Sequence, residues 1–172
     1  DGLTITVPAG PLNLDLSAVV IPADPLMSLH LLVMPYFVDG KVTLHGKWPE
    51  YVQHLHDVMD ILHEFGLRIT IGADRITSRM GTRPKELNVD ITSCQEYLPL
   101  VLAMSMGLRG KCAITLDTSR EDVEHAQDLL ENLGAGYAIE PGRLQVWLPG
   151  TRKARESPWR SPGPYWTLAG AL

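Results

Sequence analysis

The stretch ENLGAGYAIEPGRLQV, residues 131–146, repeats the pattern of HEFGLRITIGADRITS, residues 63–78, position by position. Upstream of each stretch, GKCAIT at 110–115 falls on GKVTLH at 40–45. The intervening loops differ in length, and such a difference costs little free energy. A similarity that recurs after about 70 residues predicts a supersecondary unit that is used more than once in the chain.

Each copy of the unit contains a strongly apolar segment, LMSLHLLVMPYFV at 26–38 and EYLPLVLAMSMGL at 96–108. Apolar side chains lie almost all round these two predicted helices, so we expect both to be buried on every side. Pro35 is expected to kink the first helix, and Pro99 to lie near the first turn of the second. Helices buried in this way need sheets around them, which predicts helices inside and strands outside.

The second helix of each copy is amphipathic. Its apolar stripe consists of Val52, Leu55, Val58, Met59, Leu62 and Phe65 in one copy, and of Val123, Ala126, Leu129, Leu130 and Leu133 in the other. Gly66 and Gly134 follow these helices, where glycine favours a helix end, and a β-hairpin closes each copy. The predicted fold class is α/β (α+β), with repeated βαβαββ units in an inside-out α/β barrel-like domain.

The whole chain, residues 1–172, is expected to form one partial domain. Residues 1–19 read as the closing hairpin of an earlier unit, 20–82 as the first full unit and 83–150 as the second. Residues 151–172 are interpreted as a linker and the start of a third unit, the alternative being a mobile tail rich in Pro and Trp. Because the sequence does not begin with Met, we expect it to be processed or to be a piece of a longer protein.

The composition limits the partners of the chain. The net charge of −5 argues against nucleic-acid and acidic-membrane partners. No apolar run reaches the roughly 18 residues that a membrane-spanning helix needs. The two cysteines have no metal-ligand spacing and form no disulfide framework. These observations predict a cytoplasmic protein with no metal and no cofactor.

Two segments resemble a known family. VVIPADPLMSLHLLVMPYFVDGKVTLHG, residues 19–46, and PKELNVDITSCQEYLPLVLAMSMGLRGKCAIT, residues 84–115, are similar to segments of the enolpyruvyl transferases, in particular of the EPSP synthases (3-phosphoshikimate 1-carboxyvinyltransferases). The resemblance covers about residues 1–150. It lies in the hydrophobic pattern, the glycine positions and the unit length more than in exact identities.

The resemblance implies a reaction and its partners. In that family phosphoenolpyruvate is protonated at its methylene carbon, a hydroxyl of shikimate 3-phosphate or a related acceptor attacks, and phosphate leaves. The site lies in a cleft between two domains, with a carboxylate as acid/base and Arg and Lys side chains around the phosphates. This chain would supply part of one lobe, so alone it should be inactive and would need the remaining lobe or self-association.

The resemblance also implies candidate site residues. Glu96 falls where the family has its catalytic Asp, although Ser93-x-x-Glu96 also fits a helix capping box. Arg120 and Glu121 match a substrate-binding Lys-Glu pair only if the segment is shortened, and Thr118-x-x-Glu121 is a second possible capping box. The family's Asp-His-Arg before the third apolar helix is missing, because Ser-Pro-Gly-Pro-Tyr occupies residues 161–165.

Other chemistry-bearing side chains have a structural interpretation. His56, Asp60 and His63 lie on one helical face with a possible metal spacing, but opposite the apolar stripe, which favours a solvated face. His30 reads as a core histidine and Cys94 as an inert thiol. Two other functions stay open. One is a non-catalytic domain of the same fold used in interaction or regulation. The other is an RNA 3′-terminal phosphate cyclase, which the negative net charge disfavours.

Overall fold

The computed structural model describes residues 24–38, 40–48, 54–118, 121–149 and 159–172. The first part of the chain contains α1 (Pro25–Leu32), α2 (Met34–Phe37), β1 (Lys41–His45), α3 (Leu55–Glu64), β2 (Leu67–Ile71) and β3 (Arg75–Met80). The second contains β4 (Leu87–Asp90), the 3₁₀ helix η2 (Gln95–Tyr97), α4 (Leu98–Met106), β5 (Cys112–Thr115), α5 (Asp122–Asn132), β6 (Gly136–Glu140) and β7 (Arg143–Trp147). Helix α6 (Pro164–Ala171) follows at the C-terminal end.

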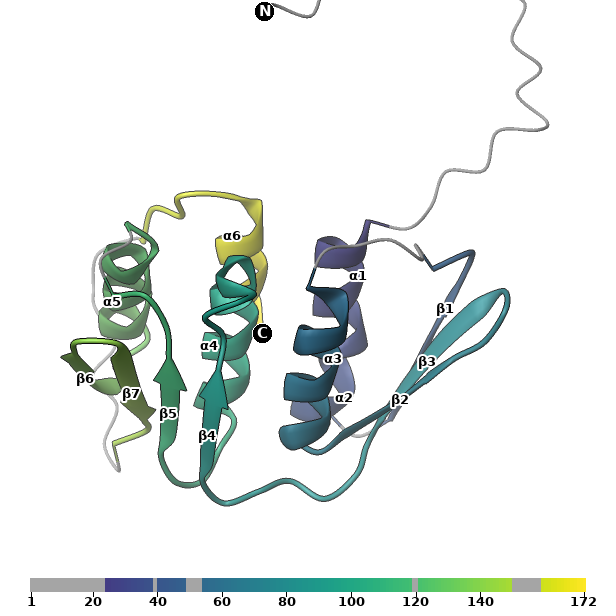
Figure 1. Cartoon of the computed structure of the whole chain (residues 1–172), viewed down its shortest axis with the longest axis horizontal. Helices are drawn as coiled ribbons and strands as arrows, with labels where there is room; N and C mark the ends of the chain where they lie inside the picture. The colour runs from purple at the N-terminus through teal and green to yellow at the C-terminus, as the bar shows by residue number, and fades with distance from the viewer. Residues whose placement is uncertain (1–23, 39, 49–53, 119–120, 150–158) are drawn as a thin grey trace, which may run out of the picture.

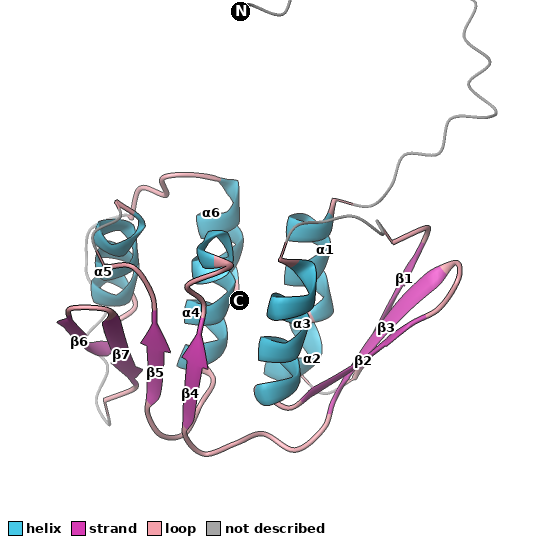
Figure 2. Ribbon diagram, viewed as in Figure 1, coloured by secondary structure: helices cyan, strands magenta, loops and turns pink. Residues whose placement is uncertain are grey.

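Two sheets cover two groups of helices in an α+β arrangement (Figures 1 and 2). The first sheet has the order β1-β3-β2 and is antiparallel, and the second has the order β4-β5-β7-β6, with only β4 and β5 parallel. Helices α1, α2 and α3 contact the first sheet, while α4 and α5 contact the second. The α+β class and the hairpins β2-β3 and β6-β7 are therefore confirmed. The repeated βαβαββ unit stays a prediction, and the proposed hairpin at 1–19 lies outside the described residues.

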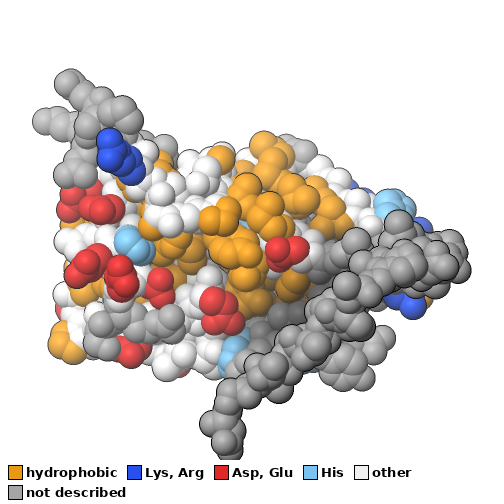
Figure 3. Space-filling model, turned by 90° about the horizontal axis from the view of Figure 1, so that it is seen from above, with side chains coloured by type: hydrophobic (Ala, Val, Ile, Leu, Met, Phe, Trp, Pro, Cys, Tyr) orange, Lys and Arg blue, Asp and Glu red, His pale blue; other side chains and the backbone are white. Residues whose placement is uncertain are grey.

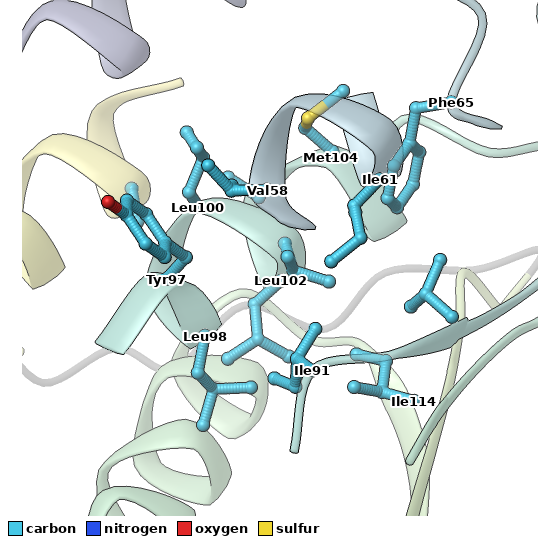
Figure 4. Packing of buried hydrophobic residues seen from close by; sticks show 14 of the residues in the cluster. Val58, Ile61, Phe65, Ile91, Tyr97, Leu98, Leu100, Leu102, Met104 and Ile114 are labelled. Atoms are coloured by element: carbon cyan, nitrogen blue, oxygen red, sulfur yellow. The ribbon is translucent and has the colours of Figure 1, made fainter. Parts of the chain in front are cut away.

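Helix α4 confirms the prediction of a helix buried all round. Every residue of α4 except Met106 is buried, and Pro99 lies in the first turn as expected. Figure 4 shows its side chains gathered with residues of α3, with Ile91 just after β4 and with Ile114 of β5. Full burial of each such leucine contributes roughly 1.5–3 kcal/mol to the free energy of folding. The labelled members of this cluster are Val58, Ile61, Phe65, Ile91, Tyr97, Leu98, Leu100, Leu102, Met104 and Ile114.

Helix α1 corrects the same prediction for the first copy. Leu29 and Leu32 are fully buried, but Met27, Leu31 and Met34 are 43%, 51% and 37% exposed. These three residues line an open groove together with Leu168, Ala171 and Leu172 at the C-terminal end, so they are only partly covered. The expected break near Pro35 is confirmed, because α1 ends at Leu32 and α2 begins at Met34.

The amphipathic helices and their glycine ends are confirmed. Helices α3 and α5 bury the predicted stripes over the described residues. Gly66 and Gly134 have φ angles of 93° and 67°, in the left-handed region that glycine adopts at little cost. At Gly66 a Cβ atom would also collide with the carbonyl oxygen of Thr82, so a side chain has no room there.

The C-terminal segment packs into the fold. Helix α6 contacts α4 and α1, and it buries Trp166 and Ala169. A packed helix agrees with the predicted apolar helix in this segment, while its membership of a third unit stays a prediction. In the described part of the chain, no helix is long and apolar enough to cross a membrane.

Candidate functional site

Five helices begin at one end of the molecule. Figure 1 shows the N-terminal ends of α1, α3, α4, α5 and α6 toward its upper edge, and β4 and β5 point toward the same edge. Helix N-termini carry a partial positive charge and unpaired N–H groups, which favour anions. At α1 the Asp24 side chain accepts a hydrogen bond from the N–H of Met27 at 3.2 Å, so this helix end is capped within the chain.

The loop after β4 is tied to α3. Asp90 Oδ1 accepts hydrogen bonds from Thr92 Oγ1 at 2.6 Å and from Thr92 N at 2.9 Å, and these bonds lower the pKa of Asp90. Ser93 Oγ donates to Asp57 Oδ2 at 2.6 Å, and the same carboxylate oxygen lies 3.6 Å from His54 Nδ1. The alternative interpretation of Ser93 as a helix cap is therefore wrong, because its hydroxyl bonds to another helix and Cys94 precedes η2 without a side-chain cap.

Glu96 is an exposed carboxylate on a rigid support. It lies in η2 between buried Gln95 and buried Tyr97 and directly precedes α4. Gln95 Nε2 donates to the carbonyl of Asp117, and Gln95 Oε1 accepts from the N–H of Asp117, both at 3.0 Å. These bonds join the loop after β4 to the loop after β5. Sequence reasoning missed this contact, because nothing in the local pattern pairs residues 22 positions apart.

The charge of Glu96 acts on its buried neighbours. Burial raises the pKa of Cys94 to about 11, and the negative charge of Glu96 adds to the effect. The same two causes, in the same order, raise the pKa of Tyr97 to about 12. Both groups are therefore neutral at pH 7, which agrees with the prediction that Cys94 is an unreactive thiol. Both cysteines of the chain are free and buried.

The predicted substrate-binding pair is described only in part. Glu121 is exposed at the N-cap of α5 and makes no side-chain capping bond, while Arg120 lies outside the described residues. Thr118 Oγ1 accepts a hydrogen bond from the N–H of Gly142 at 3.1 Å rather than from the start of α5. Within the described residues no hydrogen bond or ion pair joins Glu96 to Glu121, or either of them to a cation.

The end of the molecule at which these helices begin presents carboxylates beside hydrophobic side chains. Figure 3 views this end and shows Asp and Glu side chains around a hydrophobic area, with Lys and Arg at its margins. The preorganised cations that a phosphate site requires are therefore not gathered among the described side chains on this face.

The remaining histidine candidates are two solvent-exposed side chains on α3 and one side chain in the core. His56, Asp60 and His63 are exposed on α3, as expected, and the described residues contain no group that could hold a metal ion. His30 is 4% exposed, with Nδ1 2.7 Å from the carbonyl oxygen of Leu26. Burial lowers the pKa of His30, so the ring is neutral at pH 7 and Nδ1 carries the donated proton. This agrees with a core histidine.

Comparison with known proteins bears on the fold. No protein-family model and no curated protein sequence matches the chain. Among solved structures, the enolpyruvyl transferase NikO from Streptomyces tendae is similar with a TM-score of 0.58 and 19% identity, over 74% of this chain and 31% of NikO. EPSP synthase from Acinetobacter baumannii aligns over the same shares with a TM-score of 0.48 and 15% identity. The chain thus spans under a third of those proteins, and its α+β fold matches part of an enolpyruvyl transferase.

Proposed function

We propose that this chain forms part of one lobe of an enolpyruvyl transferase. The parent protein would transfer the enolpyruvyl group of phosphoenolpyruvate to a hydroxyl of shikimate 3-phosphate or a related phosphorylated acceptor. One observation carries the proposal. In a fold shared with NikO, an exposed carboxylate, Glu96, lies in the 3₁₀ turn that precedes α4, a helix buried at every residue but Met106.

Glu96 is the proposed acid/base. A carboxylate at this point can take the proton of the attacking hydroxyl, provided that the acceptor binds within hydrogen-bonding distance. The buried helix behind it and the Gln95–Asp117 hydrogen bonds hold the local backbone, and such rigidity is what positioned catalysis requires. Arg120 and Glu121, which precede α5 in the sequence, are proposed to bind the substrate.

The proposed site is incomplete without the rest of the parent. A phosphate of the substrate needs several cations, and the described end of this chain gathers carboxylates instead. We therefore assign the missing cations to the opposing lobe. Residues 1–172 alone are expected to bind shikimate 3-phosphate very weakly or not at all, and micromolar binding in a calorimetric titration would contradict this assignment.

The alternative function is that of a non-catalytic domain of the same fold that acts in interaction or regulation. The observation that favours it is the same group of carboxylates, since Asp57, Asp90, Glu96 and Glu121 would repel anionic substrates. Phosphate release from phosphoenolpyruvate by the intact parent, with and without shikimate 3-phosphate, separates the two functions. An enzyme releases phosphate only when the acceptor is present, and a non-catalytic domain releases none.

A further inference from the structure

The outward face of the sheet β1-β3-β2 is strongly basic. Side chains alternate along each strand, and one set points away from the helices. The outward set consists of Lys41, Thr43 and His45 on β1, Arg68 and Thr70 on β2, and Arg75, Thr77 and Arg79 on β3. It therefore contains four Lys and Arg side chains and no carboxylate, in a chain whose net charge is −5.

Three of these cations stand in one row across the sheet. Lys41 is the register partner of Arg79 on one side, and Arg68 is its partner on the other. Like charges directly opposite each other destabilise a sheet. No ion pair with a carboxylate relieves this row within the residues that the structure describes. The row therefore lowers the stability of the sheet unless an anion binds to it.

The next row supplies hydroxyl groups. Thr43, Thr77 and Thr70 are register partners, and the hydroxyl oxygens of Thr43 and Thr77 are 3.3 Å apart. Arg75 lies beyond them on the same face. The cations and threonines together line a hollow of about 400 Å³, within the range of small-ligand sites. Guanidinium groups that surround hydroxyl donors match the oxygens of a phosphate group.

The second sheet provides a comparison within the chain. One outward row of that sheet is Asp90, Thr115, Arg143 and Glu140, in which the single cation has a carboxylate as its register partner. Charged side chains often protect the exposed edge strands of a sheet. This does not explain the cations of the first sheet, because Arg75 and Arg79 lie on its central strand. The basic face is a particular feature of β1, β2 and β3.

We propose that this face binds a compact di- or triphosphate group, either free or attached to a small molecule. Extended polyanions fit the observations less well, because the remainder of the chain is strongly negative. The outward set contains neither Phe, Tyr or Trp to stack on bases nor an aliphatic side chain to enter a lipid layer. The site lies on the solvent face of the sheet, away from Glu96, and does not depend on the proposed transferase activity.

The test uses the whole 172-residue chain with sodium tripolyphosphate in a buffer of low ionic strength. Calorimetry should give saturable binding that weakens as salt is added, and thermal unfolding should shift upward with the ligand. Changing Arg68, Arg75 and Arg79 together to Gln should weaken binding by about tenfold or more, since each lost arginine removes charged hydrogen bonds. ATP in place of tripolyphosphate shows whether a nucleoside-borne triphosphate binds as well as the free one, and either result supports the site.

A matched variant with Lys85, Arg109 and Arg143 changed to Gln removes the same charge from other exposed positions and should alter the affinity by less than about threefold. The single change Arg79→Gln adds a second measurement that does not need the ligand. It should raise the unfolding temperature of the free protein and reduce the shift that tripolyphosphate causes.

The proposal is wrong if tripolyphosphate does not saturate by about 10 mM, a concentration at which specific binding is already very weak. It is also wrong if both triple variants lose affinity equally, or if duplex DNA or anionic vesicles bind while tripolyphosphate does not.

Discussion

The side chain of Gln95 makes two hydrogen bonds, each 3.0 Å long, with the backbone N–H and C=O of Asp117. Gln95 is 2% exposed, so water cannot replace these bonds if they are lost. They hold together the loops that follow the parallel strands β4 and β5. The position of Glu96, the next residue along the chain, depends on this contact.

Replacement of Gln95 by Ala should lower the free energy of unfolding by about 1–3 kcal/mol, because two buried backbone groups lose their partners. Urea denaturation followed by circular dichroism measures the change. Gln145→Ala is the control, since the Gln145 side chain has no hydrogen bond among the described residues and should cost much less. Equal losses in the two variants would show that the Gln95 contact is not a stabilising one.

Arg83 should stabilise the junction between the two parts of the chain. Its guanidinium lies 4.3 Å from the ring centroid of Tyr36 and donates hydrogen bonds to the carbonyl oxygens of Tyr36 and Gly107. Arg83→Ala should lower the free energy of unfolding by about 1–2 kcal/mol. Arg83→Lys should retain only part of this stability, because lysine lacks the planar guanidinium group that makes both hydrogen bonds. Arg109→Ala, at an exposed position, should be nearly neutral in the same denaturation experiment. A full rescue by lysine would contradict the role given to the guanidinium geometry.

Alanine substitutions at Gly66 and Gly142 distinguish the cost of backbone strain from the cost of a steric clash. Both have positive φ angles, 93° and 75°, but a Cβ atom meets the Thr82 carbonyl at Gly66 and nothing within 4 Å at Gly142. Gly142→Ala should therefore cost only the backbone strain, about 1–2 kcal/mol. Gly66→Ala should cost about 3 kcal/mol or more, because overpacking adds to the strain. Thermal unfolding of both variants checks the order, and a smaller loss at Gly66 would refute the contact with Thr82.

His30 should make stability depend on pH. Burial lowers its pKa in the folded state, so the neutral ring stabilises the fold above the unfolded value of 6.5, and this contribution is lost as the pH falls below 6.5. In His30→Asn, an amide N–H can donate to the Leu26 carbonyl without titrating. The free energy of unfolding should therefore fall less between about pH 7 and 5.5 than in the wild type. Urea unfolding at several pH values gives the slope for both proteins, and an unchanged slope in His30→Asn would contradict the prediction.

The sequence predicted much of the fold because periodicity reports which faces prefer burial. It anticipated the kinked first helix, the burial of α4 at every residue but Met106, the stripes of α3 and α5, and the glycines at their ends. It failed for the exposed side of α1. Hydropathy shows that Met27, Leu31 and Met34 prefer burial, but it does not show whether another part of the protein covers them. Whether the two similar stretches form a true repeat stays a prediction.

The sequence predicted the site less well, because a site depends on contacts between distant residues. Ser93 fits a local capping pattern but bonds to Asp57 on another helix. The basic face of the first sheet was also missed. Its alternating residues are visible in each strand, but only the register that sets Lys41 beside Arg79 brings the cations together.

The most direct test of the central proposal is enolpyruvyl transfer by the intact parent protein. Phosphate release from phosphoenolpyruvate with shikimate 3-phosphate should be compared between the parent, its Glu96→Gln variant and the control Glu86→Gln, an exposed position before β4. The proposal predicts an active parent, a loss of about a hundredfold or more in Glu96→Gln and a nearly unchanged rate in Glu86→Gln. A folded parent with no transfer activity, or a Glu96→Gln variant as active as the parent, would contradict it.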